Sequence, residues 1–302
     1  MYRIISFVLL TLTVSLLSSC SVKPVKALNS PFADTHLHFN WNQEEIISAK
    51  EVINILEQHN VSLAVVSSRP SSNALKLRKA GGDWVLPIYS PYYKPGIKHT
   101  WYRDPQVLTH AREALSSGQY FGVGEVHLVS GLGPSRENAI FKGLLQLAKE
   151  YDLPVLLHTD SSRFEYLLPI CQENKEIRFI WAHAGGILNA EQVDRLMAQC
   201  ENVWVEMSAR DPWHYGLFTD EALKLLPGWK ALFEKYPDRF MTGTDPVWNA
   251  HQTYRWYESD EGWSHYGKLN NFHRQWLHQL NPVLEKKIRI DNALRFYKYK
   301  VE

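Results

Sequence analysis

This chain has few cysteines and no excess of charge of either sign. Its 302 residues include three cysteines, too few for a disulfide framework to hold together a domain of this size. The 33 lysines and arginines are balanced by 32 aspartates and glutamates. We therefore expect no nucleic-acid partner, because proteins that bind nucleic acid electrostatically carry a basic patch or stripe. A hydrophobic content of 45% excludes a disordered chain and indicates a globular domain with a sizeable core.

An apolar run long enough to span a bilayer is also missing. The segment Ile4–Leu17 is uncharged but has only fourteen residues, and a membrane-spanning helix needs about 20. Because it follows Arg3, the segment is typical of the hydrophobic region of a secretory signal peptide. It ends in Leu17-Ser18-Ser19-Cys20, which resembles the lipobox of bacterial lipoproteins. The resemblance implies that Cys20 becomes a lipidated N-terminus; an ordinary cleaved signal peptide and a buried helix are the alternatives.

The chain divides accordingly into three parts. Residues 1–19 are predicted to be a signal peptide, residues 20–30 the lipidated cysteine with a short polar tether, and residues 31–302 the folded domain. Cleavage removes one charged residue, Arg3, so that 32 basic and 32 acidic residues are left. Membrane attachment then rests on lipid, and more than one acyl chain gives stable anchoring. We expect a membrane-anchored lipoprotein of the cell envelope, and the absence of an acidic residue at Ser21 is compatible with the outer membrane.

The other two cysteines are predicted to be buried thiols. Cys171 and Cys200 each lie near the end of a predicted helix, where a cysteine commonly serves as a small apolar side chain. A disulfide between them is the alternative, since an oxidising compartment permits one.

Eight short β-rich segments alternate with helical patterns after residue 31. The expected strands are Phe32–His38, Ser62–Ser67, Trp84–Tyr89, Tyr120–Val126, Pro154–His158, Arg178–His183, Val203–Glu206 and Phe240–Asp245. The expected helices are Gln43–His59, Ser72–Ala80, Pro105–Ser117, Arg136–Tyr151, Arg163–Asn174, Asn189–Gln199 and Thr219–Tyr236. The strands are continuous apolar runs, which suits a parallel sheet that is buried on both faces. We predict an α/β fold, a closed (β/α)₈ TIM barrel of one domain, with a doubly wound open sheet as the alternative.

Polar residues stand at five of the expected strand ends, where the active sites of such barrels lie. His36 and His38 end the first strand, and side chains two residues apart on a strand point to the same side. The fourth, fifth, sixth and eighth strands end at Glu125, His158, His183 and Asp245. Imidazoles together with carboxylates suit Zn²⁺, and the set is too large for one tetrahedral site.

These residues resemble the metal-binding motifs of the amidohydrolase superfamily of metal-dependent hydrolases. The matches are His36-Leu37-His38, His158, His183 and Asp245, each on the corresponding strand and in the same order. The stretches Phe32–His38, Ala182–Gly186, Gly243–Pro246 and Asp291–Phe296 look most like the amidohydrolase-2 branch. The resemblance covers essentially all of residues 31–300.

The resemblance implies one or two divalent ions per chain, with Zn²⁺ as the ion that we expect. The implied metal ligands are His36, His38, Glu125, His158, His183 and Asp245. No lysine stands at the end of the fourth strand, and Gly124-Glu125 instead resembles TatD-type members, in which a glutamate binds metal. We therefore predict two ions bridged by Glu125. In members with one metal the histidine of the sixth strand is left for catalysis; Glu125 would then be a hydrogen-bonding partner of a histidine, and His127 is an alternative to it.

The implied reaction is attack of water on a small organic ester, lactone or amide. Bound metal lowers the pKa of water and polarises the scissile bond. Asp245 is predicted to accept the proton of the water and to return it to the leaving group. His183 is predicted to bind the second ion, or to polarise the substrate oxygen if one ion is present.

Basic and aromatic residues in the loops after the strands point to a small cyclic or aromatic acid as the substrate. Arg210 or Arg69 is predicted to bind its carboxylate, and Trp248 belongs to an aromatic rim. For most of the aromatic residues the alternative, packing of the long loops against the barrel, is favoured.

Other functions are compatible with the same barrel. The alternatives are a non-oxidative decarboxylase of a small carboxylic acid, a phosphodiesterase, and a surface binding protein without turnover. The neutral charge argues against a nuclease. The presence of all six candidate ligands argues against a binding protein without turnover, because a barrel that had lost catalysis should lack some of these residues.

Overall fold

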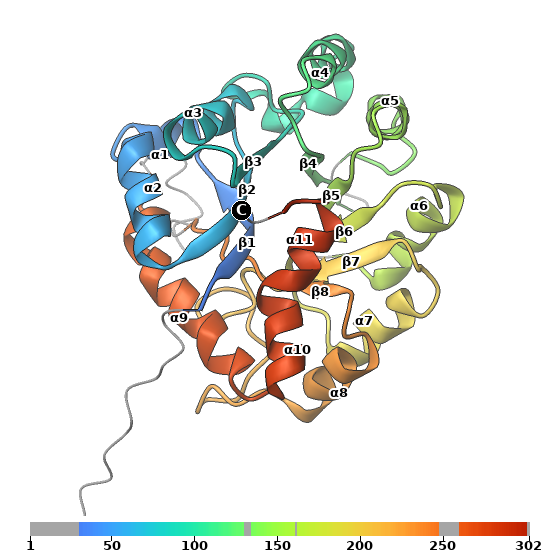
Figure 1. Ribbon diagram of the computed structural model, residues 1–302. Helices are drawn as coiled ribbons and strands as arrows, with labels where there is room; N and C mark the ends of the chain where they lie inside the picture. The colour runs from blue at the N-terminus through green and yellow to red at the C-terminus, as the bar shows by residue number, and fades with distance from the viewer. Residues whose placement is uncertain (1–29, 130–133, 161, 248–259, 301–302) are drawn as a thin grey trace, which may run out of the picture.

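Eight parallel strands follow one another around the computed structural model, which describes residues 30–129, 134–160, 162–247 and 260–300 (Figure 1). They form two sheets, with the orders β1-β2-β3 and β4-β5-β6-β7-β8. The strands are β1 (Phe32–His38), β2 (Val61–Ser67), β3 (Val85–Ile88), β4 (Val123–His127), β5 (Val155–His158), β6 (Phe179–Trp181), β7 (Val203–Glu206) and β8 (Phe240–Met241). The predicted strand segments are confirmed, with ends that differ by a few residues.

Backbone hydrogen bonds join the two sheets at both edges. Between β3 and β4, the N–H of Tyr89 donates to the carbonyl of Gly122 at 2.8 Å. Between β8 and β1, the N–H of Thr35 donates to the carbonyl of Thr242 at 3.0 Å. The sheet therefore closes on itself, and the predicted single-domain (β/α)₈ barrel is confirmed over the open-sheet alternative.

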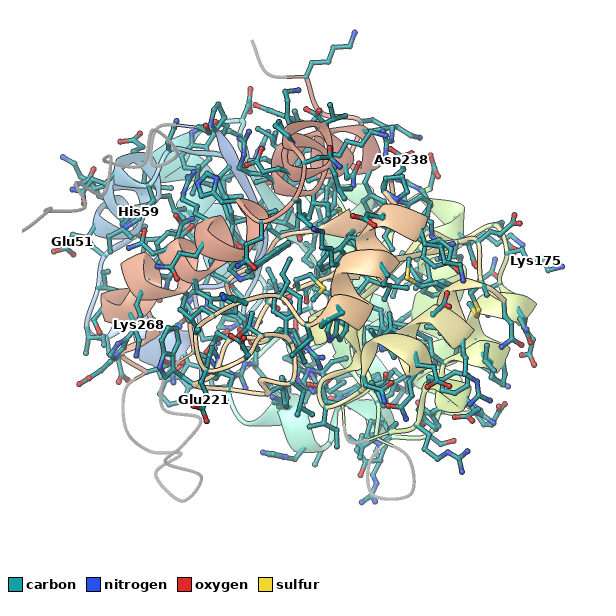
Figure 2. The ribbon with its side chains drawn as sticks, turned by 90° about the horizontal axis from the view of Figure 1, so that it is seen from below. Glu51, His59, Lys175, Glu221, Asp238 and Lys268 are labelled. Atoms are coloured by element: carbon teal, nitrogen blue, oxygen red, sulfur yellow. A yellow bond between two sulfur atoms is a disulfide. The ribbon has the colours of Figure 1, made fainter. Side chains whose placement is uncertain are left out.

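Helices surround the barrel (Figure 1). The α-helices are α1 (Trp41–Glu44), α2 (Ala49–Gln58), α3 (Ser72–Gly81), α4 (Gln106–Ser116), α5 (Ala139–Glu150), α6 (Leu168–Glu173), α7 (Ala190–Met197), α8 (Pro227–Lys235), α9 (Tyr266–Leu277), α10 (Pro282–Lys286) and α11 (Asn292–Phe296). The 3₁₀ turns are η2 (Ile97–His99), η3 (Trp101–Arg103), η4 (Phe164–Tyr166), η5 (Ala182–Gly185) and η7 (Gly262–His265), and a π-helical turn, η8 (Lys287–Asp291), precedes α11. Charged side chains such as Glu51, Lys175 and Glu221 lie at the periphery (Figure 2).

Several predicted helices are shorter in the structure, and the reason is clear for two of them. The segment Gln43–His59 divides into α1 and α2, because Ser48 caps α2: its Oγ accepts from the N–H of Glu51, and the Glu51 carboxylate accepts from the N–H of Ser48 at 2.8 Å. The prediction for Thr219–Tyr236 is wrong at its start. The helix begins at Pro227, whose fixed φ suits the first helical position.

The barrel interior is closed at the end opposite to the candidate site. Apolar side chains of alternate strand positions, among them Leu63, Leu156 and Ile180, pack there against Ile290 and Phe296. Figure 1 shows α11 lying across this end of the barrel. Buried histidines and carboxylates of the strands, such as His36 and Glu125, lie at the other end, where the strands terminate.

The prediction of buried thiols at Cys171 and Cys200 is wrong, because the two cysteines form a disulfide. Cys171 lies in α6 and Cys200 follows α7, and their Cα atoms are 5.9 Å apart. Asn202 ties the same segments together, since its side-chain amide donates to the carbonyl of Cys171 at 3.2 Å. Both cysteines are buried, so burial was predicted correctly but their proximity was not.

The predicted signal peptide, Cys20 and most of the tether lie outside the described residues. Within the described part of the chain, no helix has both the length and the apolar character of a membrane span.

Candidate metal centre

The six predicted metal ligands gather at the C-terminal end of the barrel. His36 and His38 are in β1, Glu125 in β4 and His158 at the end of β5, while His183 is in η5 and Asp245 follows β8. Although β8 ends at Met241, the N–H of Asp245 still donates to the carbonyl of His36 at 2.8 Å. That hydrogen bond fixes the Asp245 side chain beside β1.

Three of these side chains face one point. The Nε2 atoms of His36 and His38 are 3.1 Å apart, and Asp245 Oδ1 lies 3.2 Å from the Nε2 of His38 and 3.9 Å from that of His36. Asp245 Oδ1 is buried and has no hydrogen-bond partner within the described structure. A buried carboxylate oxygen without a donor is costly unless a cation is bound. These three residues therefore fit a divalent ion.

Glu125 lies at the centre of the histidines. Its Oε1 is 2.7 Å from His158 Nδ1, 3.4 Å from His183 Nε2 and 3.8 Å from His36 Nε2, while its Oε2 is 3.6 Å from His38 Nε2. One carboxylate thus reaches the histidines of β1 on one side and those of β5 and η5 on the other. Glu125 is therefore placed where it could contribute a carboxylate ligand on either side.

Hydrogen bonds set the orientation of His38. Its Nδ1 is 2.8 Å from the carbonyl oxygen of Ser67, which can only accept. Nδ1 therefore carries the proton, and the lone pair of Nε2 points toward His36 and Asp245. The ring is in the tautomer that a metal ligand needs.

His183 is oriented by Ser208 in a comparable way. His183 Nδ1 is 2.8 Å from Ser208 Oγ, and the hydroxyl of Ser208 in turn donates to Glu206 Oε1 at 2.9 Å. Since that hydroxyl has its proton directed at the carboxylate, it accepts the Nδ1 proton of His183. The Nε2 lone pair of His183 is then directed at Glu125 and Asp245.

Glu206 is a functional residue that the sequence analysis did not single out. Its side chain is fully buried, and its Oε1 lies 2.9 Å from His36 Nδ1 and accepts from the N–H of His183 at 2.8 Å. Burial raises the pKa of Glu206, but the charge and hydrogen bond of His36 outweigh it and bring the pKa to about 2. The signal was its position as an acidic residue at the end of an otherwise apolar strand, the same signal that identified Glu125.

The carboxylates give the site a potential that favours cations. Burial lowers the pKa of His36, but the charges of Glu206, Asp245 and Glu125 raise it well above its usual value. Burial likewise lowers the pKa of His183, and the nearby carboxylates raise it to about 9. A site that draws protons onto its imidazoles this strongly also attracts a divalent ion.

Asp34 supports the floor of the site. It is fully buried, and burial raises its pKa to about 7. The carboxyl group accepts from the backbone N–H and the hydroxyl of Thr244 at 2.9 and 2.7 Å and from the hydroxyl of Tyr266 at 2.9 Å. Through Thr244, Asp34 ties β1 to the segment that carries Asp245.

A glycine permits the close approach of β1, β7 and β8. A Cβ added at Gly243 would lie 2.8 Å from Glu206 Oε2 and 2.8 Å from the Cβ of His36. Both distances are below van der Waals contact, so any larger residue would push the His36–Glu206 pair apart.

Five of the six predicted metal ligands, all except His36, line a cavity of about 400 Å³. Its lining residues are His38, Ser67, Arg69, Tyr92, Lys98, Glu125, His127, His158, His183, Ala209, His214, Tyr215, Asp245 and Val247. Arg69 is thus where the sequence predicted it. A volume of this size is typical of a site for a small organic molecule.

The structure does not bring Arg210 to this cavity. Its side chain is fully buried behind the wall, where Nη2 donates to the carbonyl of Leu188 at 2.7 Å and the guanidinium lies 4.7 Å from the centre of the Trp229 ring. The chain after β7 turns this side chain toward α8 rather than toward the cavity. Trp248 lies outside the described residues.

His127 packs beside Glu125 as a hydrogen-bonding neighbour. Burial lowers the pKa of His127 well below its usual value, so the ring is neutral. Its Nδ1 lies 2.7 Å from the hydroxyl of Tyr92, which also accepts from the backbone N–H of His127. That hydroxyl donates to Nδ1, so the remaining ring proton is on Nε2, and the Nε2 atom lies 3.5 Å from Glu125 Oε2. His127 therefore lies between Tyr92 and Glu125.

Comparisons with known proteins agree with this arrangement. A family model described as amidohydrolase matches residues 33–299. A search of the curated proteins found no match. Among solved structures, a probable 2-pyrone-4,6-dicarboxylic acid hydrolase from Acinetobacter baumannii with bound citric acid is similar, at 15% identity and a TM-score of 0.56, over 89% of this chain and 99% of the other.

Two further structures share the fold. One is an amidohydrolase from Burkholderia multivorans with bound zinc, at 13% identity and a TM-score of 0.56, over 90% of this chain and 100% of the other. The other is a 2,6-dihydroxybenzoate decarboxylase with bound 2,6-dihydroxybenzoate, at 10% identity and a TM-score of 0.50, over 89% of this chain and 98% of the other. At these identities the likeness establishes a common fold.

Proposed function

This chain belongs to the amidohydrolase family and is an enzyme of the amidohydrolase superfamily. We propose that it is a metal-dependent hydrolase that acts on a small ester, lactone or amide. The observation that carries the proposal is the convergence of His36 Nε2, His38 Nε2 and the unpartnered Oδ1 of Asp245. Nitrogen and carboxylate donors in this arrangement favour Zn²⁺. The zinc-containing amidohydrolase of the same fold supports that choice.

Two ions fit the donor atoms. His36, His38 and Asp245 would hold one, His158 and His183 the other, and Glu125 would bridge them. A bound divalent ion supplies Lewis acidity, which lowers the pKa of a water molecule and polarises the scissile carbonyl.

The side chains divide the proton transfers among them. Asp245 faces the cavity as a carboxylate. Burial raises its pKa, but the charges of His36, His38 and His183 outweigh burial and hold the pKa below its usual range. Asp245 is placed to accept a proton from the attacking water and to deliver it to the leaving oxygen or nitrogen. His183, held by Ser208, keeps its Nε2 on the same side of the cavity.

The test combines elemental analysis with turnover. We expect the full chain to contain two ions, Glu125→Gln to contain at most one, and hydrolysis of a panel of lactones, esters and amides to fall by about a hundredfold or more in Asp245→Asn. His278→Gln, at the exposed C-cap of α9, is the matched control and should change neither quantity. A purified chain without bound metal and without metal-stimulated turnover would contradict the proposal.

A non-oxidative decarboxylase is the second candidate. His36, His38 and Asp245 converge by themselves, so a single ion needs neither Glu125 nor His183. His183 would then be available to deliver a proton to carbon, and a decarboxylase shares the fold. One ion per chain in the wild type and in Glu125→Gln, together with CO₂ release from aromatic acids, would favour this candidate over hydrolysis.

We also propose that the enzyme is a lipoprotein of the cell envelope, anchored through Cys20 and acting on small molecules outside the cytoplasm. The disulfide between Cys171 and Cys200 supports this location, because disulfides persist in oxidising compartments.

A further inference from the structure

We propose that the substrate carries a carboxylate at the end away from the bond that is broken, and that Lys98 and Arg69 together hold this carboxylate. The inference rests on the proposed function for the chemistry at the metal ligands, while the binding of the carboxylate needs no turnover. It assigns a substrate-binding role to Lys98, a residue of the turn η2.

Lys98 and Arg69 stand in one wall of the cavity although they are distant in sequence. Arg69 follows β2, and Lys98 lies in the loop that follows β3. Both residues are half-buried. In the part of the chain that the structure describes, no carboxylate lies within ion-pair distance of either side chain.

Two neighbouring cations are electrostatically unfavourable without a counter-ion. Arg69 and Lys98 line the same cavity. Burial and the charge of Arg69 together lower the pKa of Lys98 to about 8, although Glu125 and Asp245 act in the opposite direction. Once metal ions neutralise Glu125 and Asp245, the two cations have no compensating charge, so an anionic ligand stabilises the pair.

The cavity lining contains two chemically distinct groups of residues. The predicted metal ligands His38, Glu125, His183 and Asp245 come from β1, β4, η5 and the segment after β8, and the two cations come from the loops after β2 and β3. A single small molecule in about 400 Å³ therefore meets the metal ligands and the cations together. Arg offers a planar pair of donors and Lys a point charge, a combination that suits a carboxylate.

The lysine and arginine content of the lining favours a small anion over a highly charged one. Among the described residues of the lining, Arg69 and Lys98 are the arginine and the lysine, and Tyr92 adds no charge because burial raises its pKa far above its usual range. One guanidinium and one ammonium match a carboxylate or a small dicarboxylate better than a polyphosphate, which needs more positive charge.

The experiment measures binding by calorimetry to the full chain, with matched ligands. Isophthalate and glutarate are compared with isophthalamide and glutaramide, which have nearly the same shape without charge, and benzoate is compared with phenylphosphonate. We expect at least one dicarboxylate to bind at least about tenfold more tightly than its diamide. Lys98→Met and Arg69→Gln should each remove most of this preference, and Lys98→Arg and Arg69→Lys should restore part of it.

Matched controls come from the same loop. Lys94→Met and Arg103→Gln remove exposed cations that do not line the cavity, and they should leave the preference unchanged. Equal binding of acids and amides, no binding of any carboxylate, or a preference that survives in Lys98→Met and Arg69→Gln would overturn the inference. Stronger binding of phenylphosphonate than of benzoate would overturn the assignment to a carboxylate. Because these are binding measurements, a carboxylate site without hydrolysis would count against the proposed reaction alone.

Discussion

Glu206 lies directly behind His36, with its Oε1 2.9 Å from His36 Nδ1, on the side of the ring opposite to the Nε2 atom that faces His38. The same oxygen accepts from the backbone N–H of His183 at 2.8 Å. One buried carboxylate thus fixes a histidine of β1 and a histidine of η5. In metal sites such partners raise the basicity of the ligand and hold its ring in place.

Glu206→Gln is expected to weaken metal binding about 10- to 100-fold, because the amide keeps the volume but loses the charge that holds both histidines. Affinity is measured by competition with a chromogenic chelator. Glu201→Gln, an exposed residue just before β7, should have no effect. Unchanged affinity in Glu206→Gln would show that His36 and His183 are positioned without it.

Ser208→Ala should lower kcat by about tenfold or more and leave KM nearly unchanged, because the Nδ1 of His183 loses its acceptor while the cavity lining stays intact. Steady-state kinetics on the best substrate of the panel provide the measurement. Ser208→Thr keeps the hydroxyl and should retain most of the activity. An equal loss in both variants would point to packing rather than to the hydrogen bond.

Carboxylate binding should weaken as pH rises through about 8. The pKa of Lys98 is lowered to about 8 by burial and by Arg69, so the ammonium is present below that pH and is lost above it. The dissociation constant of the preferred dicarboxylate, measured between pH 6.5 and 9.5, should therefore rise at the alkaline end. In Lys98→Arg the charge persists, and the alkaline rise should disappear.

Loss of the Cys171–Cys200 disulfide should lower the free energy of unfolding by about 3 to 4 kcal/mol, the loop-entropy effect for a sequence separation of 29 residues. Urea unfolding of the wild type and of the double variant Cys171→Ala/Cys200→Ala gives the difference. Reductant should destabilise the wild type and leave the double variant unchanged. A wild type that is insensitive to reductant would contradict the disulfide.

Cys20→Ala should abolish incorporation of labelled palmitate and move the protein from the detergent phase to the aqueous phase of a Triton X-114 extract, because the acyl chains provide the anchor. Cys171→Ala serves as the control and should still be labelled. Labelling that persists in Cys20→Ala would contradict a lipid anchor at this position.

The local pattern of the sequence was enough to predict the barrel and the ligands on its strands. Side chains alternate along a strand, so His36 and His38 had to share a side. The C-terminal ends of parallel strands meet at one end of a barrel, so Glu125 and His158 had to lie near them. These rules depend only on the direction of the chain and on the alternation of side chains along a strand, and both can be read from the sequence.

The tertiary structure alone decided which of the remaining polar residues reach the site. Arg210 and Lys98 both lie in loops, and no periodicity predicts which way a loop side chain points; the structure turns Arg210 toward Trp229 and brings Lys98 to the cavity. The pairing of Cys171 with Cys200 and the contact of Glu206 with His36 likewise join segments that are far apart in sequence. Such contacts depend on how the helices and loops pack around the closed barrel, which local sequence patterns do not specify.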